Sequence, residues 1–346
     1  MTPPSFPRRL LAGVLPVLAA LFVLAVLAEG ATRFLNRGQT IYDIEMYRYS
    51  RLLKEDAPAD AAAMHHWHRP NASATLQGVE IRTNELRMRD KARTAKPAPG
   101  VHRILVMGDS ITLGWGVPQE SSYAARLDPL LAKQSPGQYE VMDAGVGNYT
   151  LSRMVGFYDY ALHKTEPEVV VLAIYLTNAS REQESSLSRL FDTPLQFPVF
   201  LWSRGLRVYS RFSTSTSFKD FYLDLFRDGR PEYEDFKKQL RSFIERLRAE
   251  NKQVLLLSMP DVRYASQKPY PFASVSEHVL GIGRDASALT LDLLPSVADL
   301  APERAVNSVE DRHPSVLAHE RFANAILDAL RQAAIVPGPA APEPPK

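Results

Sequence analysis

Five short apolar runs, separated by stretches with a helical pattern, constrain the fold more than any other feature of this 346-residue chain. The runs are Ile104–Met107, Tyr139–Met142, Val169–Ile174, Val254–Leu257 and Leu291–Leu293. Short, continuous apolar runs bounded by glycine, proline or polar residues are typical of parallel strands buried on both faces. Between them, Glu232–Glu250 and the last stretch before the C-terminus repeat apolar residues at steps of three and four, as amphipathic helices do. This alternation predicts an α/β protein, a three-layer α/β/α sandwich with a central parallel sheet.

The N-terminus carries a second strong signal, a charge-free apolar run from Leu10 to Ala28 that follows Arg8 and Arg9. At ~1.5 Å per residue, this run is close to the ~30 Å thickness of the hydrocarbon core of a bilayer. It predicts an uncleaved transmembrane signal anchor, with the arginines in the cytoplasm and the rest of the chain outside the cytoplasmic membrane, in the periplasm. The alternative is a signal peptide cleaved near Ala28-Glu29-Gly30-Ala31, which would release the rest as a secreted protein.

The domain organisation expected from these signals has five parts. They are a cytoplasmic N-terminus (1–9), the transmembrane anchor (10–28), an extracytoplasmic segment and linker (29–99), the α/β domain (100–335) with an insertion around 182–230, and a disordered proline-rich tail (336–346). Within the segment before the domain, Gly78–Thr83 alternates enough to be a strand. The aromatic residues between Leu190 and Tyr222 are expected either to stack on sugar rings or to belong to the core.

Composition excludes several kinds of chemistry. The chain has no cysteine, which removes disulfides, thiolate zinc sites, iron–sulfur clusters and a cysteine nucleophile. Its 41 Lys and Arg residues against 39 Asp and Glu residues leave a net charge of +2, so nothing points to nucleic acid as a partner. The sequence also lacks a Gly-x-Ser-x-Gly elbow, a phosphate-binding loop, a dinucleotide fingerprint and a His-Glu-x-x-His helix. No cofactor is expected.

Ser110 is the candidate nucleophile. The first apolar run leads straight into Gly108-Asp109-Ser110, which puts Ser110 just past the carboxyl end of a strand, where open α/β sheets bind ligands. Ser110 would also lie at the start of the next helix, whose free amides favour a developing oxyanion. A serine needs a base to become nucleophilic. His313, between the last apolar run and the last helix, is the strongest candidate for that base.

Four sequence blocks resemble the SGNH (GDSL-type) hydrolase superfamily and occur in the order of that family. They are Gly108-Asp109-Ser110, Asp143-Ala144-Gly145, Thr177-Asn178 and Asp311-Arg312-His313-Pro314. The resemblance implies a flavodoxin-like sandwich and a serine esterase, in which Ser110 attacks an ester carbonyl and His313 moves the proton. It also implies an oxyanion hole formed by the backbone amides of Ser110 and Gly145 and the side-chain amide of Asn178.

Three positions depart from the usual pattern of the family. Asp143 stands where asparagine is usual, and Ala179 follows Asn178 where aspartate is common, which removes one support for that loop. The third departure concerns the catalytic acid, because the common spacing selects Glu310, three residues before the histidine. Anchored members that continue with His-Pro use the residue two before it, so Asp311 is the preferred acid and Glu310 the alternate.

A further resemblance, to membrane-anchored bacterial members of the superfamily, lies on both sides of Ser110. It rests on His68-Arg69-Pro70, Thr83–Asp90 and Gly114-Trp115-Gly116-Val117. Some relatives of that group acetylate or deacetylate exported polysaccharides. The resemblance implies an extracytoplasmic esterase that acts through an acyl-enzyme on a small acyl ester, such as acetyl, of a glycan or lipid-linked substrate. An O-acyltransferase on an exported polysaccharide and a non-catalytic glycan-binding or assembly protein remain alternatives.

The remaining histidines allow a hypothesis from another class, a metal-dependent hydrolase. His65, His66 and His68 could ligate a metal, but no carboxylate or further histidine stands nearby at a recognisable ligand spacing. We therefore expect no metal site, and interpret this stretch as a loop that docks on the α/β domain through Trp67. His319 falls in the last helix and is expected to pack or cap rather than to act as a second base.

Overall fold

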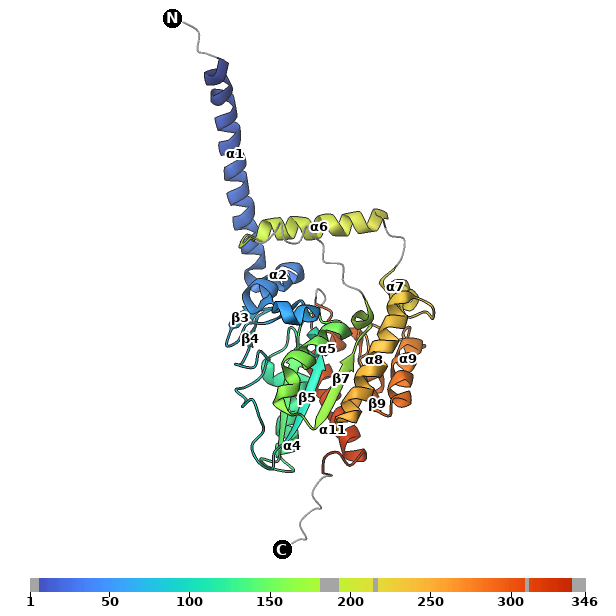
Figure 1. The fold of residues 1–346 in the computed structure, drawn as a ribbon. Helices are drawn as coiled ribbons and strands as arrows, with labels where there is room; N and C mark the ends of the chain where they lie inside the picture. The colour runs from blue at the N-terminus through green and yellow to red at the C-terminus, as the bar shows by residue number, and fades with distance from the viewer. Residues whose placement is uncertain (1–5, 181–192, 214–216, 309–310, 338–346) are drawn as a thin grey trace, which may run out of the picture. The chain divides into compact units, whose positions relative to one another are not determined.

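The structure is a computed structural model that describes residues 6–180, 193–213, 217–308 and 311–337 (Figure 1). The chain forms two compact units, each built from two separate stretches of sequence. The smaller unit consists of Met1–Arg48 and Glu184–Ser215, and the larger of Tyr49–Gln183 and Thr216–Lys346. The expected segment 29–99 and the expected insertion around 182–230 are therefore each divided between the two units.

A five-stranded parallel sheet forms the centre of the larger unit (Figure 1). Its strands, in spatial order, are β6 (Tyr139–Gly145), β5 (His102–Gly108), β7 (Val169–Ile174), β8 (Gln253–Ser258) and β9 (Leu289–Asp292). The predicted parallel sheet is confirmed, and each predicted apolar run overlaps one strand. The last strand begins two residues before the predicted run. The prediction missed this start because all four side chains of the strand are only half buried, which weakens its apolar pattern.

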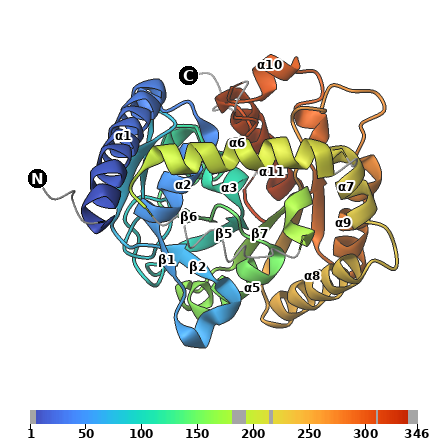
Figure 2. The same cartoon turned by 90° about the horizontal axis from the view of Figure 1, so that it is seen from above.

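Helices cover both faces of this sheet, and Figure 2 shows α5 and α8 on one side and α11 on the other. Successive residues of a strand point to opposite faces. Leu105 and Met107 of β5 belong to the core under one helix layer, and Ile104 and Val106 to the core under the other. The first layer contains α5 (Leu151–Tyr160), α8 (Pro231–Ala249) and α9 (Ala273–Asp285), and the second α4 (Tyr123–Ala132) and α11 (Val316–Gln332). The chain is a three-layer α/β/α sandwich, as predicted.

Shorter elements complete the larger unit. Two antiparallel pairs precede the sheet, β1 (Lys54–Asp56) with β2 (His66–His68) and β3 (Ser73–Leu76) with β4 (Val79–Arg82). The strand predicted at Gly78–Thr83 is β4. The remaining short helices are α3 (Ser110–Leu113), α7 (Phe218–Leu225) and α10 (Pro302–Ala305), and α2 (Tyr42–Leu53) joins the two units in sequence. Most of the expected tail lies outside the described residues, but Val336 at its start is buried.

Two helices make up most of the described part of the smaller unit, α1 (Phe6–Leu35) and α6 (Gln196–Ser213). The helix α1 extends beyond the predicted apolar run at both ends. The stretch from Val14 in α1 to Gly38, just after the end of this helix, contains a segment long and apolar enough to cross a membrane, and none of that segment is buried in the protein. This helix is therefore a candidate membrane anchor. A signal sequence has a similar length and composition, so these two properties alone do not distinguish the two.

Candidate active site

The strand order of the sheet reverses beside β5, and this reversal positions the candidate nucleophile. Strand β5 lies between β6 and β7, so the chain leaves β5 and β7 toward opposite sides and opens a crevice at their carboxyl ends. Ser110 follows β5 as the first residue of α3, and Asn178 follows β7. The carboxylate of Asp109 caps α3 by accepting the Ile111 N–H at 2.9 Å.

The structure brings Ser110, His313 and Asp311 into one chain of hydrogen bonds. The Ser110 Oγ lies 2.8 Å from the His313 Nε2, and the His313 Nδ1 lies 2.6 Å from the Asp311 Oδ1. A carboxylate at Nδ1 favours the tautomer with its proton there, which leaves Nε2 as the acceptor of the serine proton. The Asp311 side chain is fully buried and that of His313 is 15% exposed. Glu310, the alternate acid, lies outside the described residues.

Gly116 provides space for this acid, a role that was not recognised in the sequence. The other oxygen of Asp311, Oδ2, accepts a hydrogen bond from the Asn307 Nδ2 at 3.1 Å. Gly116 has a φ of +78°, and a Cβ there would lie 2.1 Å from the Asn307 Nδ2 and 2.6 Å from the Asp311 Oδ2. A side chain at this position would therefore displace the acid. The positive φ of Gly116 cannot be predicted from the sequence, so only the structure reveals this role.

The three expected oxyanion donors lie around the same turn, but two of them are already hydrogen-bonded. The Gly145 N–H donates to the Asp143 Oδ1 at 3.0 Å. The Asn178 Nδ2 donates to the Asp109 Oδ2 at 3.1 Å and to the Tyr149 carbonyl oxygen at 2.8 Å. The Ser110 N–H, at the N-terminus of α3, has no hydrogen-bond partner in the part of the chain that the structure describes. The structure thus places one donor with its N–H available and two held by acceptors.

Two buried carboxyl groups hold these donors. Burial raises the pKa of Asp143 to about 8, although the Gly145 N–H and the charge of Arg89 oppose this rise. Burial likewise raises the pKa of Asp109, against hydrogen bonds from Ile111 and Asn178. Arg89 also donates to carbonyl oxygens at the end of α3 and in the loop that follows it, at 2.6 to 2.8 Å. The site therefore rests on buried polar groups that bond to one another.

The loop that carries Asn178 is supported in spite of the alanine that follows. The Asn178 Oδ1 accepts the Tyr175 N–H at 2.6 Å, and the Asn178 N–H donates back to the Tyr175 carbonyl oxygen at 3.0 Å. The Tyr175 hydroxyl in turn donates to the Asp261 Oδ2 at 3.1 Å. Hydrogen bonds between Asn178 and Tyr175 thus support this loop, in which Ala179 is buried.

The histidines before the domain support the loop after β6. The Tyr49 hydroxyl accepts the Gly147 N–H at 3.0 Å and lies 2.6 Å from the His68 Nε2, while the His68 Nδ1 lies 3.0 Å from the Arg87 carbonyl oxygen. Both ring nitrogens of His68 therefore have hydrogen-bond partners, and burial lowers its pKa to about 3. Among the described residues, no group of three His, Asp or Glu side chains is arranged to hold a metal ion.

Trp67 and His319 have the packing roles expected of them. Trp67 is buried, with the edge of its ring against Tyr160 and the Arg87 guanidinium 3.7 Å from its ring centroid. His319 is fully buried in α11, where its Nδ1 accepts the Tyr123 N–H at 3.1 Å and so caps α4. Burial lowers the pKa of His319 to about 3, so it stays neutral.

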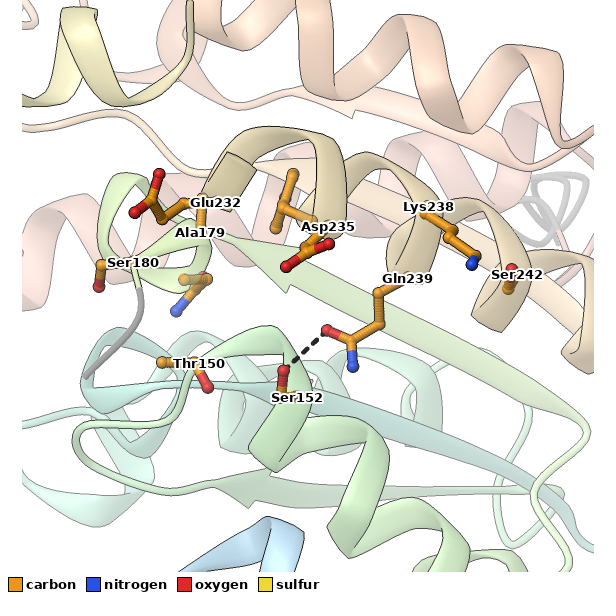
Figure 3. A pocket seen from close by; sticks show the side chains of 11 residues that line it. Thr150, Ser152, Ala179, Ser180, Glu232, Asp235, Lys238, Gln239 and Ser242 are labelled. Atoms are coloured by element: carbon orange, nitrogen blue, oxygen red, sulfur yellow. Dashed lines mark hydrogen bonds between the residues drawn. The ribbon is translucent and has the colours of Figure 1, made fainter. Parts of the chain in front are cut away.

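A polar groove of about 410 Å³ lies beside Asn178 (Figure 3). It runs between the loop after β7, the start of α5 and one side of α8. Across it, the Ser152 hydroxyl donates to the Gln239 Oε1 at 2.9 Å. Its lining combines the apolar Ala179 and Phe236 with side chains that carry hydroxyl, carboxylate, amide or ammonium groups, among them Thr150, Ser180, Glu232, Asp235, Lys238 and Ser242. Such a lining suits a ligand with many hydroxyl groups.

Comparisons with known proteins show the family of the chain. The model of the GDSL-like lipase/acylhydrolase family matches residues 106–321. Among solved structures, the chain is similar to a catalytic mutant of an acetylxylan esterase from Geobacillus stearothermophilus, with 18% identity, a TM-score of 0.45 and coverage of 68% of this chain and 96% of that one. It is also similar to TesA, with 17% identity, a TM-score of 0.44 and coverage of 67% and 99%. A comparison with curated proteins found no match.

The matched region runs from β5 into the last helix and contains Ser110, Gly145, Asn178 and His313. It covers more than half of the chain. The chain therefore belongs to the GDSL-like lipase/acylhydrolase family, and it is a carboxylic ester hydrolase.

Proposed function

We propose that this protein is a serine esterase in which Ser110 is the nucleophile, His313 the base and Asp311 the acid that orients the histidine. The observation that carries the proposal is the unbroken chain of hydrogen bonds from the Ser110 Oγ through His313 to Asp311. A serine hydroxyl becomes nucleophilic when a neighbouring base removes its proton, and a base holds the right tautomer when a third group fixes it.

The proposed reaction has two steps. In the first, the Ser110 Oγ bonds to the ester carbonyl carbon while its proton passes to the His313 Nε2. The tetrahedral intermediate then collapses, the C–O bond to the alcohol breaks, and the proton on His313 goes to the leaving oxygen. In the second step, water gives a proton to His313 and bonds to the acyl carbon. The bond from that carbon to the Ser110 Oγ then breaks, and His313 returns the proton to the Ser110 Oγ as the acid leaves. The buried Asp311 stabilises the imidazolium in both steps.

The oxyanion that forms in each step is assigned to the N–H groups of Ser110 and Gly145 and the side-chain amide of Asn178. The Asp143 and Asp109 carboxyl groups hold the last two in place before substrate arrives. An oxyanion must share these N–H groups with their present acceptors. Removal of one such donor typically lowers the rate by about 10²–10³-fold.

We further propose that α1 anchors the protein in the cytoplasmic membrane and that the catalytic unit lies in the periplasm. Two observations support this location. None of the apolar segment of α1 is buried in the protein, as expected of a helix whose side chains contact lipid in the membrane. Arg8 and Arg9 precede it, and basic residues favour the cytoplasmic side.

The proposed substrate is a small acyl ester, such as an acetyl ester, of a glycan or a lipid-linked saccharide. The polar groove beside Asn178 supports a hydroxyl-rich alcohol group, because hydroxyl, amide and carboxylate groups bind sugars through hydrogen bonds. The same groove also favours acyl transfer as a second outcome, since a sugar hydroxyl seated there could attack the acyl-enzyme in place of water.

The test compares two substrates on the full chain in detergent, p-nitrophenyl acetate and an O-acetylated oligosaccharide. We expect turnover of both, and a loss of at least about 10³-fold in Ser110→Ala. Asp235→Asn with Gln239→Ala should raise KM for the oligosaccharide alone, because both residues line the groove. Arg241→Ala, on the same helix but outside the groove, is the matched control. Equal effects on both substrates would reject the groove as the sugar site, and a new acyl-sugar product would indicate transfer.

A further inference from the structure

Helix α6 presents a row of apolar side chains to solvent. Leu201, Leu206, Val208 and Tyr209 are between 46% and 68% exposed. Leu201, Leu206 and Tyr209 border a shallow apolar groove together with Trp202 and other apolar residues of the helix. A contiguous exposed apolar surface of this kind marks a place where another molecule or a membrane binds.

The position of α6 along α1 is defined by hydrogen bonds. The carboxylate of Glu29 in α1 accepts the backbone N–H groups of Gln196 and Phe197, the first residues of α6, at 2.8 to 3.0 Å. Arg33, one turn further along α1, pairs with Glu29 and donates to the Pro194 carbonyl oxygen at 3.0 Å. A carboxylate at a helix N-terminus accepts hydrogen bonds from the free backbone amides and interacts favourably with the positive end of the helix dipole.

Glu29 is also the first charged residue after the apolar run of α1. If α1 spans a membrane, its apolar run fills the hydrocarbon core and Glu29 lies where that core meets the headgroups. The bonds from Glu29 therefore set the start of α6 at this level. Figure 1 shows α6 beginning beside α1 and running away from it rather than alongside it, so the whole of α6 can stay near the same depth.

The charge of α6 indicates which surface it meets. Its sequence holds three arginines, Arg204, Arg207 and Arg211, and no acidic residue. Cationic amphipathic helices bind in the interfacial region of membranes, with apolar side chains among the acyl chains and basic ones near anionic headgroups. A tryptophan and a tyrosine on the apolar side suit this location as well, because such rings favour the membrane interface.

We propose that α6 lies in the interfacial region of the membrane that α1 spans, with Leu201, Trp202, Leu206 and Tyr209 against the lipid. This inference rests on the proposed anchoring by α1 and adds a second membrane contact. The ligand is a lipid surface that contains anionic lipid, and not a protein partner.

Trp202 makes the proposal directly testable. The chain has three tryptophans, and the other two, Trp67 and Trp115, are buried in the larger unit. The full chain is reconstituted in vesicles of phosphatidylcholine and phosphatidylglycerol that carry a quencher at a shallow or a deep position of the acyl chain. The Trp202→Phe variant supplies the background from the buried rings. We expect the Trp202 signal to be quenched at least severalfold more by the shallow label than the background is.

Two variants separate lipid contact from folding. Leu201→Glu with Leu206→Glu should abolish most of the quenching of Trp202, because charges on the apolar side expel the helix from the interface. Ser203→Glu adds a charge outside the groove and should leave the quenching unchanged. Circular dichroism and flotation with vesicles show whether each variant folds and remains anchored.

The possible failures are distinguishable. A chain that floats with vesicles but whose Trp202 is not quenched overturns the inference and leaves the anchor intact. A chain that does not float overturns the anchor and the inference together, while esterase activity tests the catalytic proposal separately. Protection of Trp202 that depends on protein density and not on the lipid label would show that α6 contacts a second copy of the chain, and would also overturn the inference.

Discussion

Asp311 is the residue through which the proposed site can be tested most sharply at the scale of a single side chain. Asp311→Asn should lower kcat/KM for p-nitrophenyl acetate by about 10²–10⁴-fold, because an amide at this position no longer favours the His313 tautomer that accepts the serine proton. Glu310→Gln, the matched variant at the alternate acid, should retain nearly full activity. If the two effects were reversed, the acid would be Glu310.

Gly116 tests whether the position of Asp311 matters as much as its charge. Gly116→Ala places a Cβ against Asn307 and Asp311, and we expect a fall in kcat/KM of about 10²-fold from the displaced acid. Gly137→Ala is the control, because Gly137 has a similar φ of +72° with open space around it. Backbone strain is then common to both variants, and activity assays isolate the effect of the clash. Equal activities in the two variants would show that Gly116 does not protect the site.

Asp143 links the site to pH. Burial raises its pKa from the usual value near 4 to about 8, so between these pH values the folded protein keeps a proton that the unfolded chain loses. Its contribution to stability therefore falls as the pH rises from about 4 to about 8. Asp143→Asn removes this titration and keeps an oxygen that can accept the Gly145 N–H. Urea unfolding at pH 5 and pH 9 should show a smaller loss of stability in the variant, and an unchanged pH dependence would contradict the assignment.

At the scale of elements, the loop after β6 is held by residues that lie far before it in the sequence. The Tyr49 hydroxyl joins the Gly147 N–H to His68, and the Lys54 Nζ donates to the Gly147 carbonyl oxygen at 2.6 Å. Tyr49→Phe leaves both Gly147 and His68 without this partner and should cost about 1–3 kcal/mol of unfolding free energy. Tyr139→Phe, at a half-buried tyrosine, is the control. A Tyr49→Phe variant as stable as the control would show that this bond adds nothing to the fold.

The elements also show what the sequence could and could not predict. The strands of the sheet were predictable because both of their faces are buried, which leaves an unbroken apolar run such as Val169–Ile174. The start of β9 was missed because its side chains are only half buried. The positions of Ser110, His313 and Asp311 followed from the family blocks, whereas the bonds that occupy Gly145 and Asn178 depend on the placement of Asp143 and Asp109 in three dimensions.

At the scale of the whole molecule, the two units could not be predicted from local pattern. Each is assembled from two distant stretches, and one of the contacts that join them in the smaller unit lies between Glu29 and the backbone at Gln196. Neither periodicity nor composition predicts a bond between a single carboxylate and the start of a helix that lies 167 residues away in the sequence. The sequence predicts one insertion around 182–230 in the α/β domain, whereas the apolar helix α6 in this stretch belongs to the same unit as the N-terminal helix.

The central claim is that Ser110 is an activated nucleophile, and labelling with a fluorophosphonate tests it most directly. The full chain in detergent is treated with the probe, beside the variants Ser110→Ala and His313→Ala, and the adduct is located by mass spectrometry of peptides. The account predicts a single adduct on Ser110, its absence in Ser110→Ala, and much slower labelling in His313→Ala. A well-folded protein without an adduct, or with its adduct on another residue, would contradict the account, and absence of any adduct would point to a non-catalytic glycan-binding protein.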